Sequence, residues 1–196
     1  MTSTFQRDVG RGVVSFETGK LAQKANGSVV VSSGDNVLLV TATMANPREG
    51  IDFFPLTIDV EERHYARGKI PGSFFRREGR PSTFSILIAR LTDRPIRPLF
   101  PKGFRNEVQI IITPLSIDME TPYDTLAVTG ASAALSVSDI PFDGPIACTR
   151  VGYLDGEYLI NPSYEELETS QLDLIVAGSK SGVVMMEAGA SEVTED

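Results

Sequence analysis

The sequence predicts an α+β fold, and three observations lead to that prediction. Runs rich in β-branched residues recur along the chain between turn-forming Gly, Asn and Asp, which is typical of strands. Residues 82–94 carry apolar side chains at helical spacing, and residues 130–134 are all small, as in a helix that packs closely on a sheet. The chain has 196 residues, 41% of them apolar, so it can bury a sizeable core.

The first sixty residues are expected to form strands and turns. Residues 29–32 and 37–43 flank the turn-forming segment 33–36, which predicts a β-hairpin with a turn of about four residues. Residues 53–60 predict a further strand. The next segment, residues 61–81, contains three glycines and two prolines and is expected to be a long loop. Loops of that length in a compact domain are usually functional.

A helix is expected directly after this loop. Ser82 is placed to cap its N-terminus, and Pro95 and Pro98 are expected to end it. Residues 108–115 predict a buried strand, and Asp124 is expected to cap a second helix. The remaining strands are expected at residues 146–151, 158–160, 172–177 and 183–187.

The single cysteine and the lack of long apolar runs bear on the compartment. Cys148 lies in an apolar run, which favours a buried, inert thiol, and one cysteine cannot form a disulfide within the chain. Because we find neither a signal-peptide pattern nor a run of about 18 apolar residues, we expect a cytoplasmic protein without a membrane segment. His64, the only histidine, has no second His or Cys near it and is not expected to bind a metal.

Positive charge is concentrated in one segment of an acidic chain. The net charge is −8 and the pI about 4.7, yet residues 62–105 hold 11 of the 18 Lys+Arg and only 3 of the 26 Asp+Glu. Within this segment, Arg76 and Arg77 follow Phe74 and Phe75. Guanidinium groups bind phosphate oxygens, and aromatic faces stack on unpaired bases. The pattern excludes a globally basic, histone-like binder and predicts a local contact with single-stranded nucleic acid.

An alternative interpretation is a solvated loop whose arginines pair with nearby acids. Glu78 is the only acid close to the two loop arginines in the sequence, so at least one guanidinium would need another partner. On the following helix, Asp93 can pair with Arg90 or with Arg97, which lie three and four residues away.

Several motifs, taken in order, carry a resemblance to a known family. The stretch GKIPGSFFRREGRPS (68–82) is followed by ARLTDRPIRPLFP (89–101). DFFPLT (52–57) precedes them, and GASAALS (130–136) and LDLIVAG (172–178) follow. From about residue 5 to its end, the chain resembles the first core domain of the bacterial polynucleotide phosphorylases. Many separate matches in one order are more specific than any single short motif.

The resemblance implies a ribonuclease PH-like fold, with a mixed β-sheet and helices packed on it. It implies that residues 1–196 are the first of two such core domains, C-terminally truncated relative to the family, with the second core domain and the KH and S1-type domains absent. Three full-length chains would close a ring around a pore, and single-stranded RNA would pass through it with the 3′ end leading. Other RNA-degradation proteins are possible further partners.

The activity implied is phosphorolysis in the 3′-to-5′ direction. Inorganic phosphate is the co-substrate, nucleoside diphosphates are released, and Mg²⁺ assists in the second core domain. Phe74 to Arg77 would form the pore constriction, and Arg90 and Arg94 would line the wall that faces the second domain's active site. Two alternatives stay open: one phenylalanine anchors the loop to the core, and Arg80 ties the loop to the helix. The resemblance gives eight residues a contact with RNA: Phe74, Phe75, Arg76, Arg77, Arg80, Arg90, Arg94 and Arg97.

No catalytic or metal-binding residue is expected in this chain. In the family's catalytic domain, serines stand where this chain has residues 122–124, and a lysine stands where it has Ile175, although Asp173 is kept. A phosphate pocket and a metal held by carboxylates are therefore not expected, and we predict that the isolated chain positions RNA without cleaving it. The alternatives are a stand-alone, non-catalytic RNA-binding scaffold subunit of ribonuclease PH-like fold and an enzyme for small phosphorylated metabolites.

Overall fold

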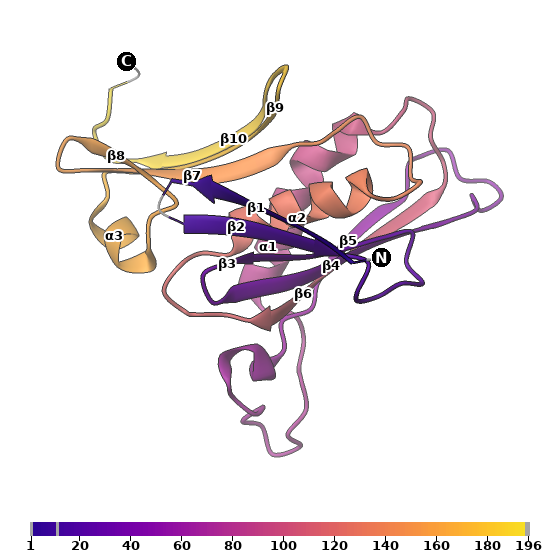
Figure 1. The fold of residues 1–196 in the computed structure, drawn as a ribbon, viewed down its shortest axis with the longest axis horizontal. Helices are drawn as coiled ribbons and strands as arrows, with labels where there is room; N and C mark the ends of the chain where they lie inside the picture. The colour runs from indigo at the N-terminus through magenta and orange to yellow at the C-terminus, as the bar shows by residue number, and fades with distance from the viewer. Residues whose placement is uncertain (1, 11, 195–196) are drawn as a thin grey trace.

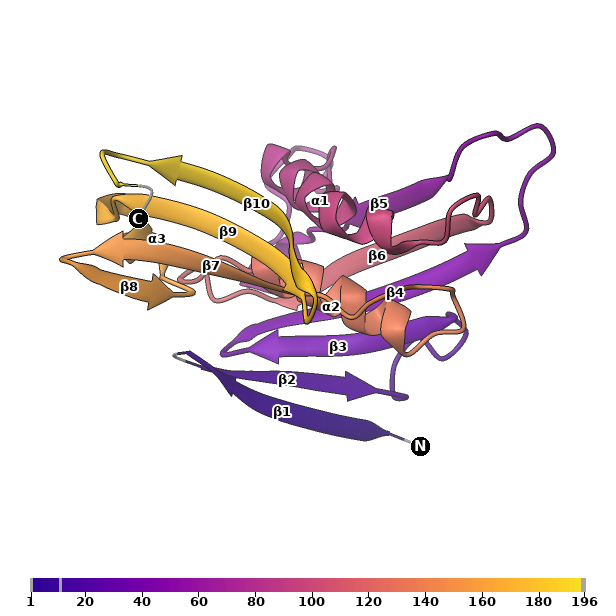
Figure 2. The same cartoon turned by 90° about the horizontal axis from the view of Figure 1, so that it is seen from above.

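Two β-sheets, with helices between and beside them, build the molecule (Figures 1 and 2). The computed structural model describes residues 2–10 and 12–194. Within these residues the larger sheet has the strand order β1-β2-β3-β4-β6-β5. It is mixed, because β5 runs parallel to β6 while the other neighbours are antiparallel. Its strands are β1 (Ser3–Val9), β2 (Gly12–Thr18), β3 (Gly27–Ser33), β4 (Asn36–Ala45), β5 (Leu56–Val60) and β6 (Glu107–Ser116).

The smaller sheet is antiparallel throughout, in the order β10-β9-β7-β8. All four strands predicted after residue 145 are confirmed, each with slightly different bounds. They are β7 (Ala147–Leu154), β8 (Glu157–Ile160), β9 (Leu172–Ser179) and β10 (Gly182–Ala190).

Helix α2 (Asp124–Ser136) lies between the two sheets and is buried over most of its length (Figure 2). Its small residues permit this position. A Cβ at Gly130 would lie 2.7 Å from Val31 Cγ1 and 3.0 Å from Val40 Cγ2, closer than side chains tolerate. The prediction that residues 130–134 pack closely on a sheet is therefore confirmed. The core continues through Ile110 and Ile112 of β6 to Ala177 of β9.

Helix α1 (Thr83–Ile96) packs beside β5, α2 and β10. Ser82 caps it as predicted, since its hydroxyl oxygen accepts a hydrogen bond from the Ser85 amide at 3.0 Å. The prediction that Pro95 ends the helix is wrong, because Pro95 lies inside it. A proline so close to the C-terminus removes a single helical hydrogen bond, and the chain continues as a 3₁₀ turn, η2 (Arg97–Leu99).

The rest of the fold agrees with the sequence-based predictions except for a 3₁₀ turn within the loop 61–81 and one additional short helix. The predicted hairpin is formed by β3 and β4, with Ser33 and Asn36 paired across its turn. The predicted loop 61–81 is confirmed, interrupted only by a 3₁₀ turn, η1 (His64–Arg67). A short helix, α3 (Tyr164–Thr169), was not predicted. In the part of the chain that the structure describes, no helix combines the length and the hydrophobicity needed to cross a membrane.

Candidate nucleic-acid interface

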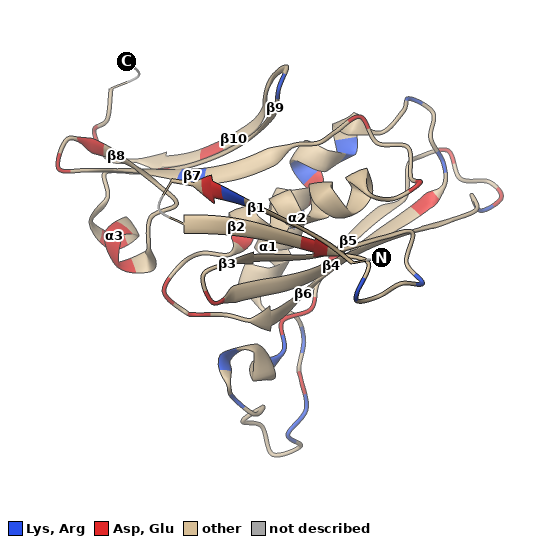
Figure 3. Cartoon of the chain, in the orientation of Figure 1, with Lys and Arg blue, Asp and Glu red and all other residues tan. Residues whose placement is uncertain are grey.

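The loop between β5 and α1 projects away from both sheets and carries much of the positive charge (Figures 1 and 3). At its tip the side chains of Phe74 and Phe75 are 95% and 75% exposed. The two rings contact each other edge to face, with centroids 5.4 Å apart. The interpretation that one of them anchors the loop to the core is therefore wrong. Two exposed aromatic rings at a loop tip offer faces on which bases can stack.

The tip arginines are free of partners within the described residues. Arg76, Arg77 and Arg80 are exposed, and none of their guanidinium groups has a hydrogen bond or ion pair there. Glu78, the one acid nearby, binds His64 instead, through the ring Nδ1 at 2.6 Å and the backbone amide at 3.0 Å. The alternative in which local acids neutralise the tip arginines is therefore wrong, and so is a tie from Arg80 to the helix.

The loop starts and ends at fixed points of the body. A carboxylate oxygen of Glu62 accepts a hydrogen bond from the Ser82 hydroxyl, and its other oxygen accepts one from the Tyr123 hydroxyl at 2.5 Å. Burial, with the Glu62 carboxylate beside it, raises the pKa of Tyr123, which keeps this hydroxyl a donor. The amide of Ile117 donates to the carbonyl of Ala66 at 2.9 Å. The exposed tip is thus carried on a well-anchored base.

A groove of about 630 Å³ runs between β5 and α1, and the helix arginines line it. Arg90 is exposed and has no ion pair within the described residues. Arg94 pairs with Glu187 of β10 at 2.7 Å, and both side chains are 55% exposed. Solvent-exposed pairs of this kind contribute at most about 1 kcal/mol, so a phosphate can replace the glutamate. These two arginines therefore remain available to an anionic ligand.

Arg97 differs from the other predicted contacts. It forms a bidentate pair with Asp93, at 2.9 and 2.7 Å, and donates to the carbonyls of Phe54 and Leu56 at 3.1 and 3.2 Å. Asp93 thus pairs with Arg97 and leaves Arg90 free. Because most donors of this guanidinium are used within the fold, the geometry favours a structural role over the predicted contact with RNA.

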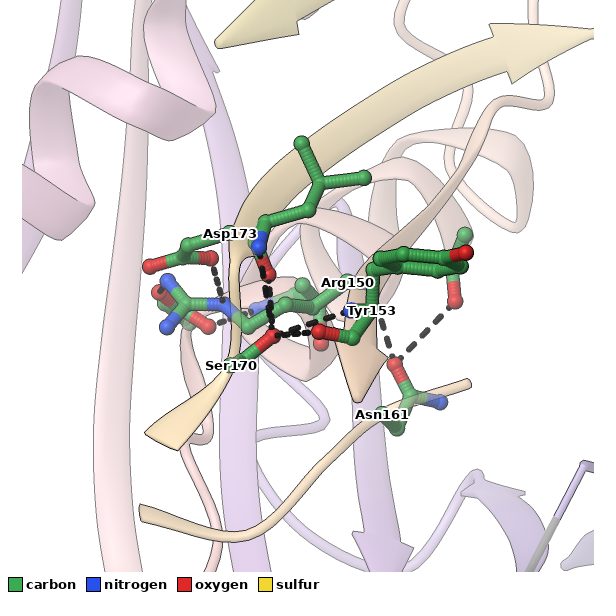
Figure 4. Close-up of polar contacts among 9 residues, drawn as sticks. Arg150, Tyr153, Asn161, Ser170 and Asp173 are labelled. Carbon is green, nitrogen blue, oxygen red and sulfur yellow. Dashed lines mark hydrogen bonds and ion pairs between the residues drawn. The ribbon is translucent and has the colours of Figure 1, made fainter. Parts of the chain in front are cut away.

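A second polar site lies where α2 meets the smaller sheet, and it is the site that sequence reasoning missed (Figure 4). Arg150 of β7 donates from Nη2 to Asp124 Oδ2 at 2.7 Å, and its Nε lies 3.5 Å from Asp173 Oδ1 of β9. The side chains of Arg150 and Asp124 are only 13% and 6% exposed. Burial raises the pKa of Asp124, and the guanidinium opposes that rise.

This cluster corrects the expectation for Asp124. Asp124 is the first residue of α2 and not its cap, which is Tyr123; its carboxylate accepts from the Thr125 amide and faces Arg150. Asp173, which the resemblance gives only as kept from the family's catalytic element, lies with its Oδ1 3.5 Å from the same guanidinium. The signal was present in the sequence: Arg150 and Lys180 are the only cations between residue 106 and the C-terminus.

The residues of the cluster do not fit a divalent metal ion. Its two carboxylates already face a cationic side chain, and the described residues contain no group of three His, Cys, Asp or Glu that could hold a metal. Hydrogen bonds fix the backbone of β7 that carries Arg150: Asn161 Oδ1 accepts from the Arg150 amide at 3.1 Å, and Ser170 Oγ accepts from the Tyr153 amide at 2.9 Å (Figure 4).

The remaining large cleft, of about 450 Å³, is lined by the β1–β2 hairpin, the start of α2 and β7. Cys148 is among its lining residues and is partly buried. Burial raises the pKa of its thiol to about 12. A thiol that stays protonated at neutral pH is a poor nucleophile, which agrees with the predicted inert cysteine.

Comparisons with known proteins agree with this fold. Residues 13–141 match the 3′ exoribonuclease family, domain 1, and residues 144–196 match domain 2 of that family. The boundary between them falls just before β7, where the smaller sheet begins. The matching solved structures include the Archaeoglobus fulgidus exosome with RNA bound to the active site (TM-score 0.67, 19% identity, 100% of this chain and 80% of that chain). Rice (Oryza sativa) Rrp46 also matches (TM-score 0.68, 14% identity, 100% and 82%). These similarities confirm the predicted ribonuclease PH-like α+β fold.

Curated relatives are much closer in sequence. The polyribonucleotide nucleotidyltransferase of Halothermothrix orenii is 62% identical over 189 residues, 96% of this chain and 27% of that protein. That of Gloeobacter violaceus is 60% identical over 184 residues, 93% of this chain and 26% of that protein. The chain thus spans about a quarter of the length of the curated relatives it matches.

Proposed function

The chain belongs to the 3′ exoribonuclease family, and from this premise we propose that it is the RNA-gripping, ring-forming part of a polyribonucleotide nucleotidyltransferase. In this proposal residues 1–196 form the first of two ribonuclease PH-like core domains. The whole protein degrades single-stranded RNA from its 3′ end, and this part guides the strand. The sequence identities of 62% and 60% to the polyribonucleotide nucleotidyltransferases of Halothermothrix orenii and Gloeobacter violaceus support the choice of enzyme.

One observation supports the RNA-gripping role above all others. Two exposed phenylalanine rings and two arginines without an ion pair in the described part of the chain share the tip of one projecting loop. Bases of a single strand stack on Phe74 and Phe75, while Arg76 and Arg77 bind the phosphates on either side. These contacts use the backbone and the generic faces of bases, so little sequence preference is expected.

The strand then runs along α1 toward the rest of the enzyme. Arg90 offers a free guanidinium, and Arg94 exchanges Glu187 for a phosphate oxygen. Arg80, at the end of the loop, connects the two contacts. Arg97 has a structural role and does not contact the strand, because it holds η2 against the carbonyls before and within β5.

In this proposal the chemical step takes place in another domain of the whole protein. An oxygen of inorganic phosphate attacks the terminal phosphodiester phosphorus, the bond to the 3′ oxygen of the preceding nucleotide breaks, and a nucleoside diphosphate leaves. The contribution of this chain is to hold the strand in line for that attack. No step involves the Asp124–Arg150–Asp173 cluster, because a side-chain cation takes the position that a metal would need.

Exposed apolar side chains on α1 and β10 support the proposed assembly into a ring of three chains. Ile86 and Leu87 of α1 and Val183 and Met186 of β10 are 49–63% exposed on neighbouring elements. Apolar surface of this kind is typical of an interface with further protein. We place the assembled enzyme in the cytoplasm, where a single reduced thiol and RNA degradation are both expected.

Fluorescence anisotropy of labelled single-stranded RNA tests the proposal. The wild-type chain should bind more tightly as the oligomer lengthens, and the Arg76→Ala/Arg77→Ala variant should bind weakly, with a salt slope smaller by roughly 1.4, or 0.7 per lost contact. The control Arg7→Ala/Arg48→Ala removes the same charge from surfaces away from the loop. Equal losses in both variants, or tight mononucleotide binding without a length effect, would refute the proposal.

The buried cluster supports the part of the proposal in which this chain, taken alone, is not catalytic. An arginine between two carboxylates leaves no cation site and adds no nucleophile. The chain alone should therefore release no ADP from poly(A) when phosphate and Mg²⁺ are supplied. Release of ADP that grows with enzyme concentration would overturn the view that this part is silent.

A further inference from the structure

Two pairs of side chains join the outgoing and returning arms of the projecting loop. Glu62 binds Ser82 at the base, and His64 binds Glu78 nearer to the tip. We call these four residues the neck. Both carboxylate oxygens of Glu78 are used, one on the imidazole Nδ1 at 2.6 Å and the other on the His64 amide at 3.0 Å. A carboxylate held by two donors has a fixed orientation.

The two arms are not equally anchored. The outgoing arm is fixed to the body, because Ala66 is buried and its carbonyl accepts from the Ile117 amide at 2.9 Å. Beyond it, the hydrogen bonding of residues 70–77 is local: the Arg76 amide donates to the Ser73 carbonyl at 2.9 Å. Among the described residues, Glu78 is therefore the first firm attachment of the returning arm, and it attaches to His64.

We propose that His64 and Glu78 are positioning residues that hold the phenylalanine–arginine tip in the direction in which it grips RNA. This inference rests on the proposed function of the tip. Breaking the His64–Glu78 pair leaves the returning arm fixed only at Ser82, so the tip samples many directions. A ligand then binds only the competent fraction of these states, and its apparent affinity falls in proportion to that fraction.

The charge of Glu78 makes the proposal testable, because positioning and a simple charge effect predict opposite changes in RNA affinity when Glu78 is neutralised. Glu78 is an anion inside a basic segment, so a simple charge effect predicts that neutralising it strengthens the binding of RNA. Positioning predicts the opposite, because Glu78→Gln loses the charge-assisted bonds of the neck. The other charged groups at the pair are Arg63, which favours the ionised carboxylate, and Glu61, which is paired with Arg63.

Glu61→Gln is the matched control for this sign test. It removes a carboxylate from the outgoing arm of the same loop but breaks no contact between the two arms, since Glu61 is bound to Arg63. We expect Glu78→Gln and His64→Ala each to weaken the binding of a 20-nucleotide single-stranded RNA by about fivefold, as if the competent fraction fell to about one fifth. Glu61→Gln should bind as tightly as the wild type or more tightly.

A conservative variant separates positioning from direct contact between His64 and RNA. His64→Asn keeps an N–H donor near the place of the imidazole Nδ1, which contacts Glu78 at 2.6 Å, but it removes the ring. Positioning predicts that His64→Asn binds RNA nearly as tightly as the wild type, whereas His64→Ala does not. Binding by His64→Asn as weak as that by His64→Ala would mean that the imidazole contacts RNA itself and would overturn the proposal.

The Arg76→Ala/Arg77→Ala variant distinguishes failure of the positioning hypothesis from failure of the proposed RNA-binding function. If this variant binds RNA normally, the tip is not the site and the proposed function itself is wrong. If it loses binding while Glu78→Gln binds as well as the wild type or better, the function stands and the neck does not position it. Thermal unfolding followed by circular dichroism should match the wild type for Glu78→Gln, whose side chain is a quarter exposed.

Discussion

Substituting the buried Arg150 gives the sharpest test of how the smaller sheet is joined to α2, the helix between the two sheets. The chain offers a matched pair of arginines for it. Arg150 and Arg94 each contact a carboxylate at 2.7 Å, but Arg150 and Asp124 are 13% and 6% exposed, whereas Arg94 and Glu187 are both 55% exposed. Residue type and distance are equal, so burial is the main difference.

The expected magnitudes follow from that difference. Breaking a buried pair from one side costs about 3–5 kcal/mol, because the remaining charge stays buried without a partner. An exposed pair contributes about 0–1 kcal/mol. Asp173 adds little, since it is 45% exposed and its contact is 3.5 Å long. Arg150→Gln should therefore lower the free energy of unfolding by about 3–5 kcal/mol, a large part of the 5–15 kcal/mol of a typical domain.

The pH dependence of that loss has a definite sign. Burial raises the pKa of Asp124 in the folded state, and without the guanidinium only hydrogen bonds from the backbone oppose the rise. A raised carboxyl pKa adds stability that is present below the unfolded pKa and is lost as the pH rises through the folded pKa. The deficit of Arg150→Gln should therefore be smaller at pH 5 than at pH 8.

Urea unfolding followed by circular dichroism at pH 5 and pH 8 measures both effects. Arg94→Gln is the control and should lose less than about 1 kcal/mol at either pH. Adding Asp124→Asn to Arg150→Gln should recover part of the loss, because it removes the unpaired charge. Equal losses for the two arginine variants, or a deficit of Arg150→Gln that does not change with pH, would refute the reasoning.

Three further predictions address single positions. Arg90→Ala should weaken RNA binding and leave unfolding unchanged, whereas Arg97→Ala should lower the midpoint of urea unfolding, and the reverse pattern would contradict the contacts of Arg97. Gly130→Ala should cost about 1–3 kcal/mol in urea unfolding, because its Cβ would lie 2.7 Å from a Val31 methyl, and an unchanged midpoint would mean that the helix shifts freely. Iodoacetamide should modify Cys148 far more slowly at pH 8 than after unfolding, since burial raises the pKa of the thiol to about 12.

Local signals made most of the fold predictable. The β-branched runs of β3 and β4, the cap at Ser82 and the small residues of α2 each act within a few residues, so the sequence displays them directly. The missed helix α3 also had a local signal, since Ser163 and Glu166 form a capping box at its N-terminus. Its six residues are too few to show a helical period, which explains the omission.

The polar sites were harder to predict because their residues meet only in three dimensions. Asp124, Arg150 and Asp173 come from a helix and two strands, and the pairing of β7 with β9 brings the last two together. The periodicity of apolar residues along the chain carries no information about contacts between distant elements. The exposed tip was predictable for the opposite reason, since four neighbouring residues form it and no distant partner among residues 2–10 and 12–194 neutralises them.

The distribution of charge along this acidic chain agrees with the single RNA path of the proposed function. Residues 106–196 carry 16 acids and 2 cations, and many of those acids lie on the strands and helix of the smaller sheet (Figure 3). That surface repels a phosphate backbone, while the loop and α1 attract it. In the proposed function, the single strand is therefore confined to the basic side, where its bases meet the aromatic tip. A uniformly basic domain would bind RNA more tightly but in many orientations, and a strand held in many orientations cannot deliver its 3′ end to one point.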